Sequence, residues 1–419
     1  MSLSENVEQY LDENRTQAYS LLQGLVHKTR CRYEEENQQL VREELDSLGA
    51  EIDSWYPDFE KLKEHPAYFP EELDYSGRPN LVGVIKGQGG GRSLVINAHV
   101  DVVDTGGEEK WNYGGPWSGK IEDNRLYGRG SADDLSGTAL ALYALRGIQA
   151  AGVELSGDVI FQSVTDEEWG GGGTLSAVLR GYTGDAALVL EPSNLEIQPV
   201  NRGGQAFRIE IEGEGIHPIH SFKGVSAIDK ATKLLRALKD REKMIQLDYR
   251  KPPFDDICTF PTFAPITVGK IEGDFFPCKI PESCTFEGLL GYFGQSWEDS
   301  RREFEDFVAR TAELDPWLRD HPPKVTWLGL NKEPSVTDFD HPIVRTLENS
   351  YEKVMSTSPK ISAFAAGTDA CFLTRYGDVP TVLFGARGFK YHSIDEYVDL
   401  DSLIDASKVV AECILNWCG

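Results

Sequence analysis

The chain has 419 residues, of which 40% are hydrophobic, and its formal net charge is −26. This length exceeds one ordinary hydrophobic core, so we expect two domains. The acidic excess disfavours nucleic acid and anionic membrane surfaces as partners, because both would repel the protein.

The amino-terminal residues and the cysteines bear on the cellular compartment in which the protein is expected. The opening segment MSLSENVEQYLDENRTQ lacks the basic and apolar regions of a signal peptide. No apolar run approaches the ~20 residues that span a bilayer. The seven cysteines are scattered and none is spaced C-x-x-C, so we expect neither a disulfide framework nor a thiolate zinc site. A cytoplasmic protein is therefore expected.

The first half of the chain alternates predicted helices and strands. Apolar periodicity predicts one amphipathic helix over residues 4–27. Within residues 80–100, two apolar runs flank QGGG and indicate two adjacent strands joined by a tight turn. An Ala- and Leu-rich helix is predicted over 132–152, and strands are predicted within 158–168 and 186–194. This alternation indicates an α/β fold with a mostly parallel sheet and helices on both faces.

The pattern changes near Arg202, where residues 205–212 alternate apolar and polar as a half-exposed antiparallel strand does. The elements that follow have the order β-α-β-β-α-β. Towards the carboxyl terminus the earlier pattern returns. We therefore predict a catalytic domain in two parts, 1–201 and 331–419, interrupted by a smaller inserted domain, 202–330.

A histidine and an aspartate end the strand-like run SLVINAHVD. The side chains of His99 and Asp101 point the same way, because residues two apart on a strand share a face. They lie at the strand's carboxyl end, where open α/β sheets keep their ligand crevice. An H-x-D pair alone is more often a polar strand end than a site, so other residues must support it.

Further polar groups follow the other predicted strands and turns of this domain. They are Asp133 and Asp134, Asp166, Glu167 and Glu168, Glu191, and His392. Two histidines with these carboxylates at one sheet edge indicate a site for two metal ions, provided that one carboxylate bridges them. Imidazole and carboxylate ligands without thiolate suit Zn²⁺, with Co²⁺ or Mn²⁺ as substitutes. Asp101 would then bond the far ring nitrogen of His99 and fix its tautomer.

The segments H-x-D, G-R-G-x-x-D, D-E-E, L-E-P and H-S-x-D-E-Y, in this order, resemble the M20 metallopeptidase family. Members include acetylornithine deacetylase, succinyl-diaminopimelate desuccinylase, aminoacylase and carboxypeptidases. The resemblance implies a mostly parallel-sheet dinuclear-zinc catalytic domain with an inserted β-α-β-β-α-β dimerisation or lid domain. It implies two zinc ions per chain, one held by His99 and Glu191, the other by Glu168 and His392, with Asp133 as the bridge.

The resemblance also implies that Glu167 is the general base and that the Asp133–Asp134 peptide bond is cis. The chemistry agrees for the base, because adjacent residues of extended backbone diverge, so that Glu168 can face a metal while Glu167 faces the substrate. The alternative for Glu167 is a solvent-facing neighbour without a role.

By the same resemblance, the segment IEGEGIHPIHSFKGVSAI places a catalytic histidine, His217, in the inserted domain of a homodimer. His217 would reach the partner's site and stabilise the oxyanion. We expect the strand 205–212 to have a free edge that pairs with its copy across a two-fold axis. Alternatively, His217 shapes a surface turn with Pro218, and His220 is expected to be a surface or substrate-rim residue.

Two positions depart from the family pattern, and they bear on the substrate. Leu135 stands where many relatives have lysine, and Cys371 in GTDACF stands where relatives that hold a substrate carboxylate often have arginine. Arg202 remains a candidate carboxylate clamp, and Arg387 and Lys390 are weaker candidates whose alternative is a plain surface charge.

The sequence therefore predicts a metal-dependent amidohydrolase that removes an N-acyl group from an amino acid or a similar small amine. The substrate would be an N-acyl amino acid or a dipeptide-like molecule. The alternatives are a dipeptidase or carboxypeptidase, and a deformylase of a non-amino-acid amide. A catalytically silent metal-binding protein is disfavoured, because it should have lost the base and Glu167 is present.

Overall fold

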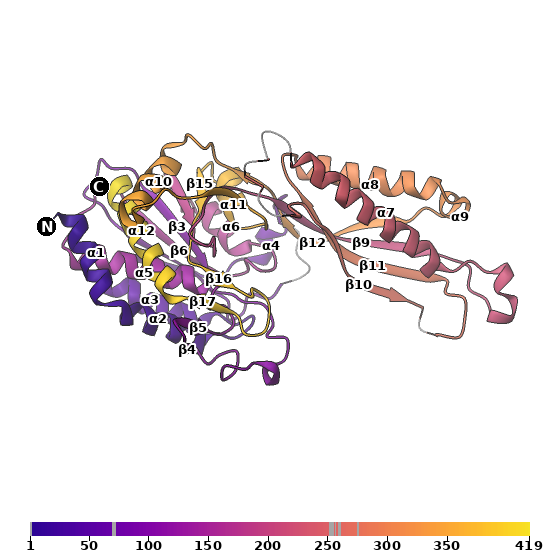
Figure 1. The fold of residues 1–419 in the computed structure, drawn as a ribbon, viewed down its shortest axis with the longest axis horizontal. Helices are drawn as coiled ribbons and strands as arrows, with labels where there is room; N and C mark the ends of the chain where they lie inside the picture. The colour runs from indigo at the N-terminus through magenta and orange to yellow at the C-terminus, as the bar shows by residue number, and fades with distance from the viewer. Residues whose placement is uncertain (1, 69–72, 251–254, 256, 259–260, 275) are drawn as a thin grey trace.

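The computed structural model describes residues 2–68, 73–250, 255, 257–258, 261–274 and 276–419. Figure 1 shows a broad body that contains both termini and a narrower arm that extends from it. The body is built on a nine-stranded sheet with the order β1-β2-β6-β3-β7-β15-β8-β13, and β14 pairs with β8. Its strands are β1 (Glu51–Trp55), β2 (Asn80–Ile85), β3 (Leu94–His99), β6 (Val159–Val164), β7 (Ala186–Val189), β8 (Ile197–Asn201), β13 (Ser335–Val336), β14 (Ile361–Phe364) and β15 (Thr381–Leu383).

Helices cover both faces of this sheet, as the sequence predicts. They are α1 (Leu3–Glu13), α2 (Arg15–Lys28), α3 (Glu35–Ser47), α4 (Phe59–Leu62), α5 (Leu135–Ala150), α6 (Gly172–Leu179), α10 (Pro342–Met355), α11 (Ala370–Tyr376) and α12 (Leu400–Cys418). Alternate residues of β3 enter different cores. Leu94 and Ile96 join the cluster that includes α1, α2, α5, α10 and α12, whereas Val95 joins the cluster that includes α6 and α11. The strands β6, β3, β7 and β15 are parallel, so their carboxyl ends share one edge.

Two local expectations are corrected by the fold. The helix predicted over 4–27 is two helices, because Asn14, between α1 and α2, is not helical. The strands β2 and β3 are not neighbours, because β6 lies between them. The QGGG segment pairs instead with the segment that precedes β6, through the N–H groups of Gln88 and Gly89, which donate to the carbonyls of Leu155 and Ser156, both at 2.8 Å.

The arm contains a second, antiparallel sheet of four strands in the order β10-β11-β9-β12. Its elements, in chain order, are β9 (Gly203–Glu212), α7 (Ala227–Asp248), β10 (Ile266–Gly273), β11 (Ser283–Tyr292), α8 (Trp297–Glu313), α9 (Pro316–Asp320) and β12 (Lys324–Lys332). Apart from the short α9, this is the predicted β-α-β-β-α-β order. Phe207 and Phe286 of the sheet and Phe304 of α8 are fully buried and form the core of this layer.

The expected free edge of residues 205–212 is wrong. This segment lies in β9, which pairs with β11 on one side and with β12 on the other. The edges of the second sheet are β10 and β12. Along β9, alternate side chains are buried, because one face of the strand is covered by helices. The alternation of apolar and polar residues indicates which face of the strand is covered, and it does not indicate whether other strands pair with its edges.

The body also contains a smaller sheet, β16-β17-β5-β4, of which Leu126 and Val398 join the main core. It contains β4 (Lys120–Glu122), β5 (Arg125–Tyr127), β16 (Gly388–Phe389) and β17 (Tyr397–Asp399). Two 3₁₀ turns are also present, at Glu108–Lys110 and Pro218–Lys223. Among the described residues, no helix combines the length and apolar character needed to cross a bilayer.

Candidate metal centre and active site

Five of the residues predicted from the strand-end motifs come together at the carboxyl edge of the larger sheet. His99 is the last residue of β3, Glu168 follows β6 and Glu191 follows β7. Asp133 precedes α5, and His392 lies in the turn between β16 and β17. The sequence brings these side chains together because the parallel strands end at one edge and their connecting loops fold over it.

Asp133 lies at the centre of this cluster. Its Oδ1 is 3.2 Å from Nε2 of His99, and its Oδ2 is 3.3 Å from Nε2 of His392. Nε2 of His392 is also 2.9 Å from Oε2 of Glu168. Each oxygen of Asp133 therefore faces a different histidine, as a bridging carboxylate would.

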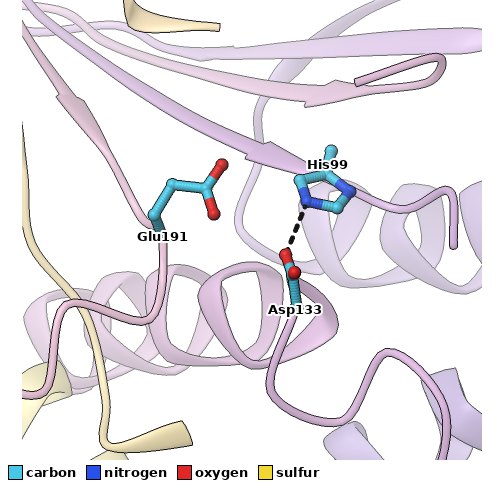
Figure 2. A group of neighbouring side chains, drawn as sticks. All are labelled: His99, Asp133 and Glu191. Carbon is cyan, nitrogen blue, oxygen red and sulfur yellow. Dashed lines mark hydrogen bonds and ion pairs between the residues drawn. The ribbon is translucent and has the colours of Figure 1, made fainter. Parts of the chain in front are cut away.

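The cluster forms two groups of three that share Asp133. The first contains His99 and Glu191, whose carboxylate is directed towards the other two side chains in Figure 2. The second contains Glu168 and His392. Within each group, the potential ligand atoms all lie within 4.8 Å of one another.

The electrostatics of this cluster fit divalent cations. Burial raises the pKa of Glu191 well above its usual value, and the nearby carboxylates of Asp133 and Glu167 raise it further. The carboxylates of Asp133 and Glu168, which accept hydrogen bonds, raise the pKa of His392 to about 11. Buried carboxylates that repel one another need nearby positive charge. Imidazole nitrogen and carboxylate oxygen without thiolate are the donors that suit Zn²⁺ and similar ions.

Asp101 contacts both the His99 ring and the acidic loop after β6. Nδ1 of His99 is 3.0 Å from the main-chain carbonyl of Asp101 and 3.5 Å from its carboxylate Oδ1. The same carboxylate accepts hydrogen bonds from the main-chain N–H groups of Glu167 (3.0 Å) and Glu168 (3.3 Å). The contact expected between Asp101 and Nδ1 of His99 is therefore made mainly by the main-chain carbonyl of Asp101. The carboxylate of Asp101 instead bonds the loop that carries Glu167 and Glu168.

Glu167 is buried beside the cluster and contacts a lysine that the sequence analysis did not identify. Its Oε1 is 3.2 Å from Nζ of Lys332, which is also bonded to Asp369. Burial raises the pKa of Glu167 to about 8, although the Lys332 charge opposes the shift. No local signal marks Lys332 as a site residue, since it is one lysine in the segment LNKEP.

A buried ion pair supports the Asp133 loop. The carboxylate of Glu396 accepts hydrogen bonds from the main-chain N–H groups of Ala132 and Asp133, each at 3.1 Å, and pairs with Arg129 at 2.5 Å. Both residues lie inside the motifs quoted above, G-R-G-x-x-D and H-S-x-D-E-Y, so their positions were a usable signal. The peptide bond between Asp133 and Asp134 is cis, as predicted.

A second buried ion pair lies behind Asp101. Arg78 donates from Nε to Glu34 at 2.8 Å, and its Nη2 is 3.7 Å from Oδ2 of Asp101. Each of these side chains is 1% exposed, so the two carboxylates share the Arg78 charge out of contact with solvent. Glu34 and Arg78 precede the predicted motifs and carried no signal in the sequence.

His217 is not part of its own chain's cluster. It precedes the turn Pro218–Lys223, which lies at the tip of the arm, at the opposite end of the molecule from the larger sheet (Figure 1). Both His217 and His220 are exposed, and Nδ1 of His217 accepts the main-chain N–H of Ile219 at 3.2 Å.

The candidate substrate-binding cations are spread over different environments. Arg202 is 7% exposed, and its guanidinium donates to the carbonyls of Ala365 (2.6 Å) and Gly203 (3.0 Å). Arg387 and Lys390 are exposed. The two departures from the family pattern, Leu135 and Cys371, are both buried.

Comparison with known proteins identifies the class and then the family. Residues 95–416 match peptidase family M20/M25/M40. Over its whole length, the chain is 30% identical to the N-formyl-4-amino-5-aminomethyl-2-methylpyrimidine deformylase of Bacillus subtilis, of which it covers 97%. The protein is a hydrolase of amide or peptide bonds. The chain belongs to the M20 family, as its motifs predict.

Solved structures share the fold. The di-peptidase Dug1p of Saccharomyces cerevisiae superposes with a TM-score of 0.76 at 15% identity, over 100% of this chain and 99% of that one. A dinuclear metal binding peptidase of the M20 family from Bacillus subtilis superposes with a TM-score of 0.61 at 17% identity, over 96% and 99%. The mixed α/β fold and the mostly parallel sheet predicted from the sequence are confirmed.

Proposed function

We propose that this amidohydrolase removes a formyl group from the amino group of a small amine that has no carboxylate, such as an aminomethylpyrimidine. One observation carries the hydrolytic function: two groups of potential metal ligands share Asp133, and the buried carboxylate of Glu167 lies beside them. The full-length relative supports the acyl group and the amine, because its name specifies an N-formyl aminopyrimidine.

The residues that were candidates for binding a substrate carboxylate are poorly suited to it, which supports an amine substrate that has no carboxylate. Arg202 donates to main-chain carbonyls at the junction of the two sheets, and Cys371 brings no positive charge. A substrate carboxylate would then depend on the exposed Arg387 and Lys390. These contacts favour the deformylase alternative over hydrolysis of N-acyl amino acids or dipeptides.

We assign His99 and Glu191 to one divalent ion, Glu168 and His392 to the other, and Asp133 to both. The donor set supports Zn²⁺, with Co²⁺ or Mn²⁺ as substitutes. When bound, such ions act as Lewis acids that polarise the amide carbonyl and make water more acidic. Asp101 and Glu396 would hold the ligands in place, through the His99 ring and the Asp133 main chain.

In this proposal Glu167 moves the proton. Its carboxylate accepts one proton from the attacking water and delivers it to the amine nitrogen as the C–N bond breaks. The products are formate and the free amine. Burial beside the cluster keeps Glu167 out of bulk water, so that the proton passes to the leaving group.

We further propose that the active unit is a homodimer in which His217 serves the partner's site. The position of the turn that follows it, Pro218–Lys223, supports this, because that turn lies at the tip of the arm, remote from the larger sheet (Figure 1). An imidazole N–H there would stabilise the developing oxyanion. With β9 paired on both sides, the dimer contact would form elsewhere on the arm, at β10, at β12 or through its helices.

A cytoplasmic location remains our proposal. All seven cysteines are free, and four of them are buried. Free thiols persist in the reducing conditions of that compartment.

The substrate proposal predicts a ranking. N-formyl aminomethylpyrimidine should be hydrolysed with a kcat/KM at least ~10-fold above those of N-acetyl and N-succinyl amino acids and of dipeptides. Release of formate and amine, measured with added Zn²⁺, Co²⁺ or Mn²⁺, tests this ranking. A preference for dipeptides or acylated amino acids would replace the proposed substrate and leave the hydrolase assignment intact.

Metal analysis should find two divalent ions per chain in fully loaded protein. Asp133→Asn should lose both ions, because both depend on this carboxylate, whereas His99→Ala and His392→Ala should each lose one. His27→Ala, at an exposed histidine of α2 that bonds the carbonyl of Ser118, is the control and should retain both. At most one tightly bound ion in the parent protein would contradict the dinuclear assignment.

Glu167→Gln should lower kcat by ~10²–10⁴-fold, the usual scale for loss of a general base. Its metal content should stay that of the parent protein, because this residue is not assigned as a ligand. Glu122→Gln, on the exposed strand β4, is the matched control and should leave kcat unchanged. Near-normal turnover by Glu167→Gln would remove this residue from the mechanism.

The role of His217 predicts complementation between subunits. His217→Ala should lower turnover by ~10²–10³-fold, as loss of an oxyanion donor does. When it is mixed with Glu167→Ala under conditions of subunit exchange, one of the two sites in each mixed dimer should regain activity. If exchange is proven and the mixture stays inactive, or if His217→Ala alone is active, His217 does not act across a dimer.

A further inference from the structure

Lys332 is a buried cation at the end of the second sheet. It is the last residue of β12, and 3% of its surface is exposed. Its carboxylate partners, Asp369 and Glu167, keep the pKa of its ammonium above the usual value although burial alone would lower it. A buried charge persists where partners compensate it, so the surroundings of Lys332 indicate what it does.

The surroundings of Lys332 form a close-fitting cradle. Its ammonium is bonded to Oδ1 of the fully buried Asp369 and lies 5.1 Å from the centre of the Phe372 ring. A Cβ on Gly367 would come within 2.5 Å of the Lys332 Cβ, and one on Gly171, at a φ of +77°, would come within 2.7 Å of Asp369 Oδ1. Glycine at these two positions lets the cation and its partner approach.

Asp369 is itself held in place from the opposite side. Its Oδ2 accepts a hydrogen bond of 2.6 Å from the hydroxyl of Thr174, in helix α6. The same hydroxyl accepts from the side chain of Asn97, in the central strand β3, at 2.9 Å. Lys332 is therefore fixed by a chain of contacts that ends in the buried strand β3 of the larger sheet.

The second contact of Lys332 is with the proposed base. Its Nζ is 3.2 Å from Oε1 of Glu167. Among the described residues, the ion pair with Lys332 is the one polar contact of the Glu167 carboxylate, and it leaves Oε2 for a proton. An ammonium on one oxygen fixes the orientation of a carboxylate that could otherwise rotate about its last side-chain bond.

We propose that Lys332 is the positioning residue of Glu167: it is carried by the second sheet, fixed by Asp369, and orients the carboxylate towards the reacting water. The inference rests on the proposed role of Glu167 as general base. It adds a residue outside the metal cluster and its predicted motifs. In this role Lys332 contacts neither the substrate nor a ligand of the metals.

The test compares kcat with KM for Lys332→Met. A positioning role predicts a ~100-fold loss of kcat, the scale of a misplaced catalytic group, with KM and metal content unchanged. In the Glu167→Gln background, the same substitution should have no further effect on the residual rate, because a residue that acts through Glu167 has nothing left to orient.

Two further variants separate positioning from loss of stability. Lys332→Met leaves Asp369 buried without its partner, so Lys332→Met with Asp369→Asn removes both charges and should restore the melting temperature while kcat stays low. Lys408→Met is the matched control, since Lys408 is mostly buried and pairs with Asp12 at 2.7 Å between α12 and α1. It should leave kcat unchanged.

Three results would overturn the proposal. A normal kcat for Lys332→Met would leave Lys332 as a structural partner of Asp369, and a raised KM with normal kcat would make it a substrate contact. An equal loss of kcat in the Glu167→Gln background would show that it acts independently of the base. Full activity of Glu167→Gln itself would refute the proposed role of Glu167 as the base, whereas an inactive Glu167→Gln beside an active Lys332→Met refutes only the positioning role.

Discussion

The arrangement of this protein depends on the burial of several carboxylates at one edge of the larger sheet. Asp133, Glu167, Glu168 and Glu191 converge there with two histidines, and burial and mutual repulsion raise the pKa of Glu167 and Glu191. Such a group is stable only where positive charge compensates it. The proposed divalent cations would supply that charge, and the same constraint extends to the residues around the cluster.

Three buried cations surround the cluster, and each pairs with a different carboxylate. Arg78 lies between Glu34 and Asp101, Arg129 bonds Glu396, and Lys332 bonds Asp369 and Glu167. In each case a carboxylate partner of the cation contacts the cluster or is the proposed base. Asp101 contacts the His99 ring and Glu396 accepts from the main chain of Asp133, whereas Glu167 is itself the proposed base. In the proposed mechanism these cations would orient the ligands and the base while they neutralise charge, as supporting residues of metal sites do.

The residues of the cluster could be predicted from the sequence because the signal is local. His99 ends β3, Glu168 and Glu191 follow β6 and β7, Asp133 precedes α5, and His392 lies between β16 and β17. The parallel strands β3, β6 and β7 place the polar residues at their carboxyl ends at one edge of the sheet whatever the strand order. The strand order itself was less predictable. QGGG is a good turn signal, yet β6 enters between β2 and β3, because the turn residues bond the segment before β6. The alternation of β9 likewise reports its covered face, and its pairing on both sides depends on distant strands.

Arg78 and Lys332 escaped prediction for a related reason, whereas Arg129 lies inside a quoted motif. A lone lysine or arginine in a sequence is most often on the surface, and only the tertiary fold shows that Lys332 is buried against Asp369. Lys332 also joins two parts of the structure, because β12 belongs to the second sheet while Asp369, Thr174 and Glu167 belong to the body. The orientation of the proposed base thus depends on how the arm is attached. The arm that carries the turn Pro218–Lys223 at its tip thus also places, at its base, the ammonium of Lys332 beside the carboxylate of Glu167.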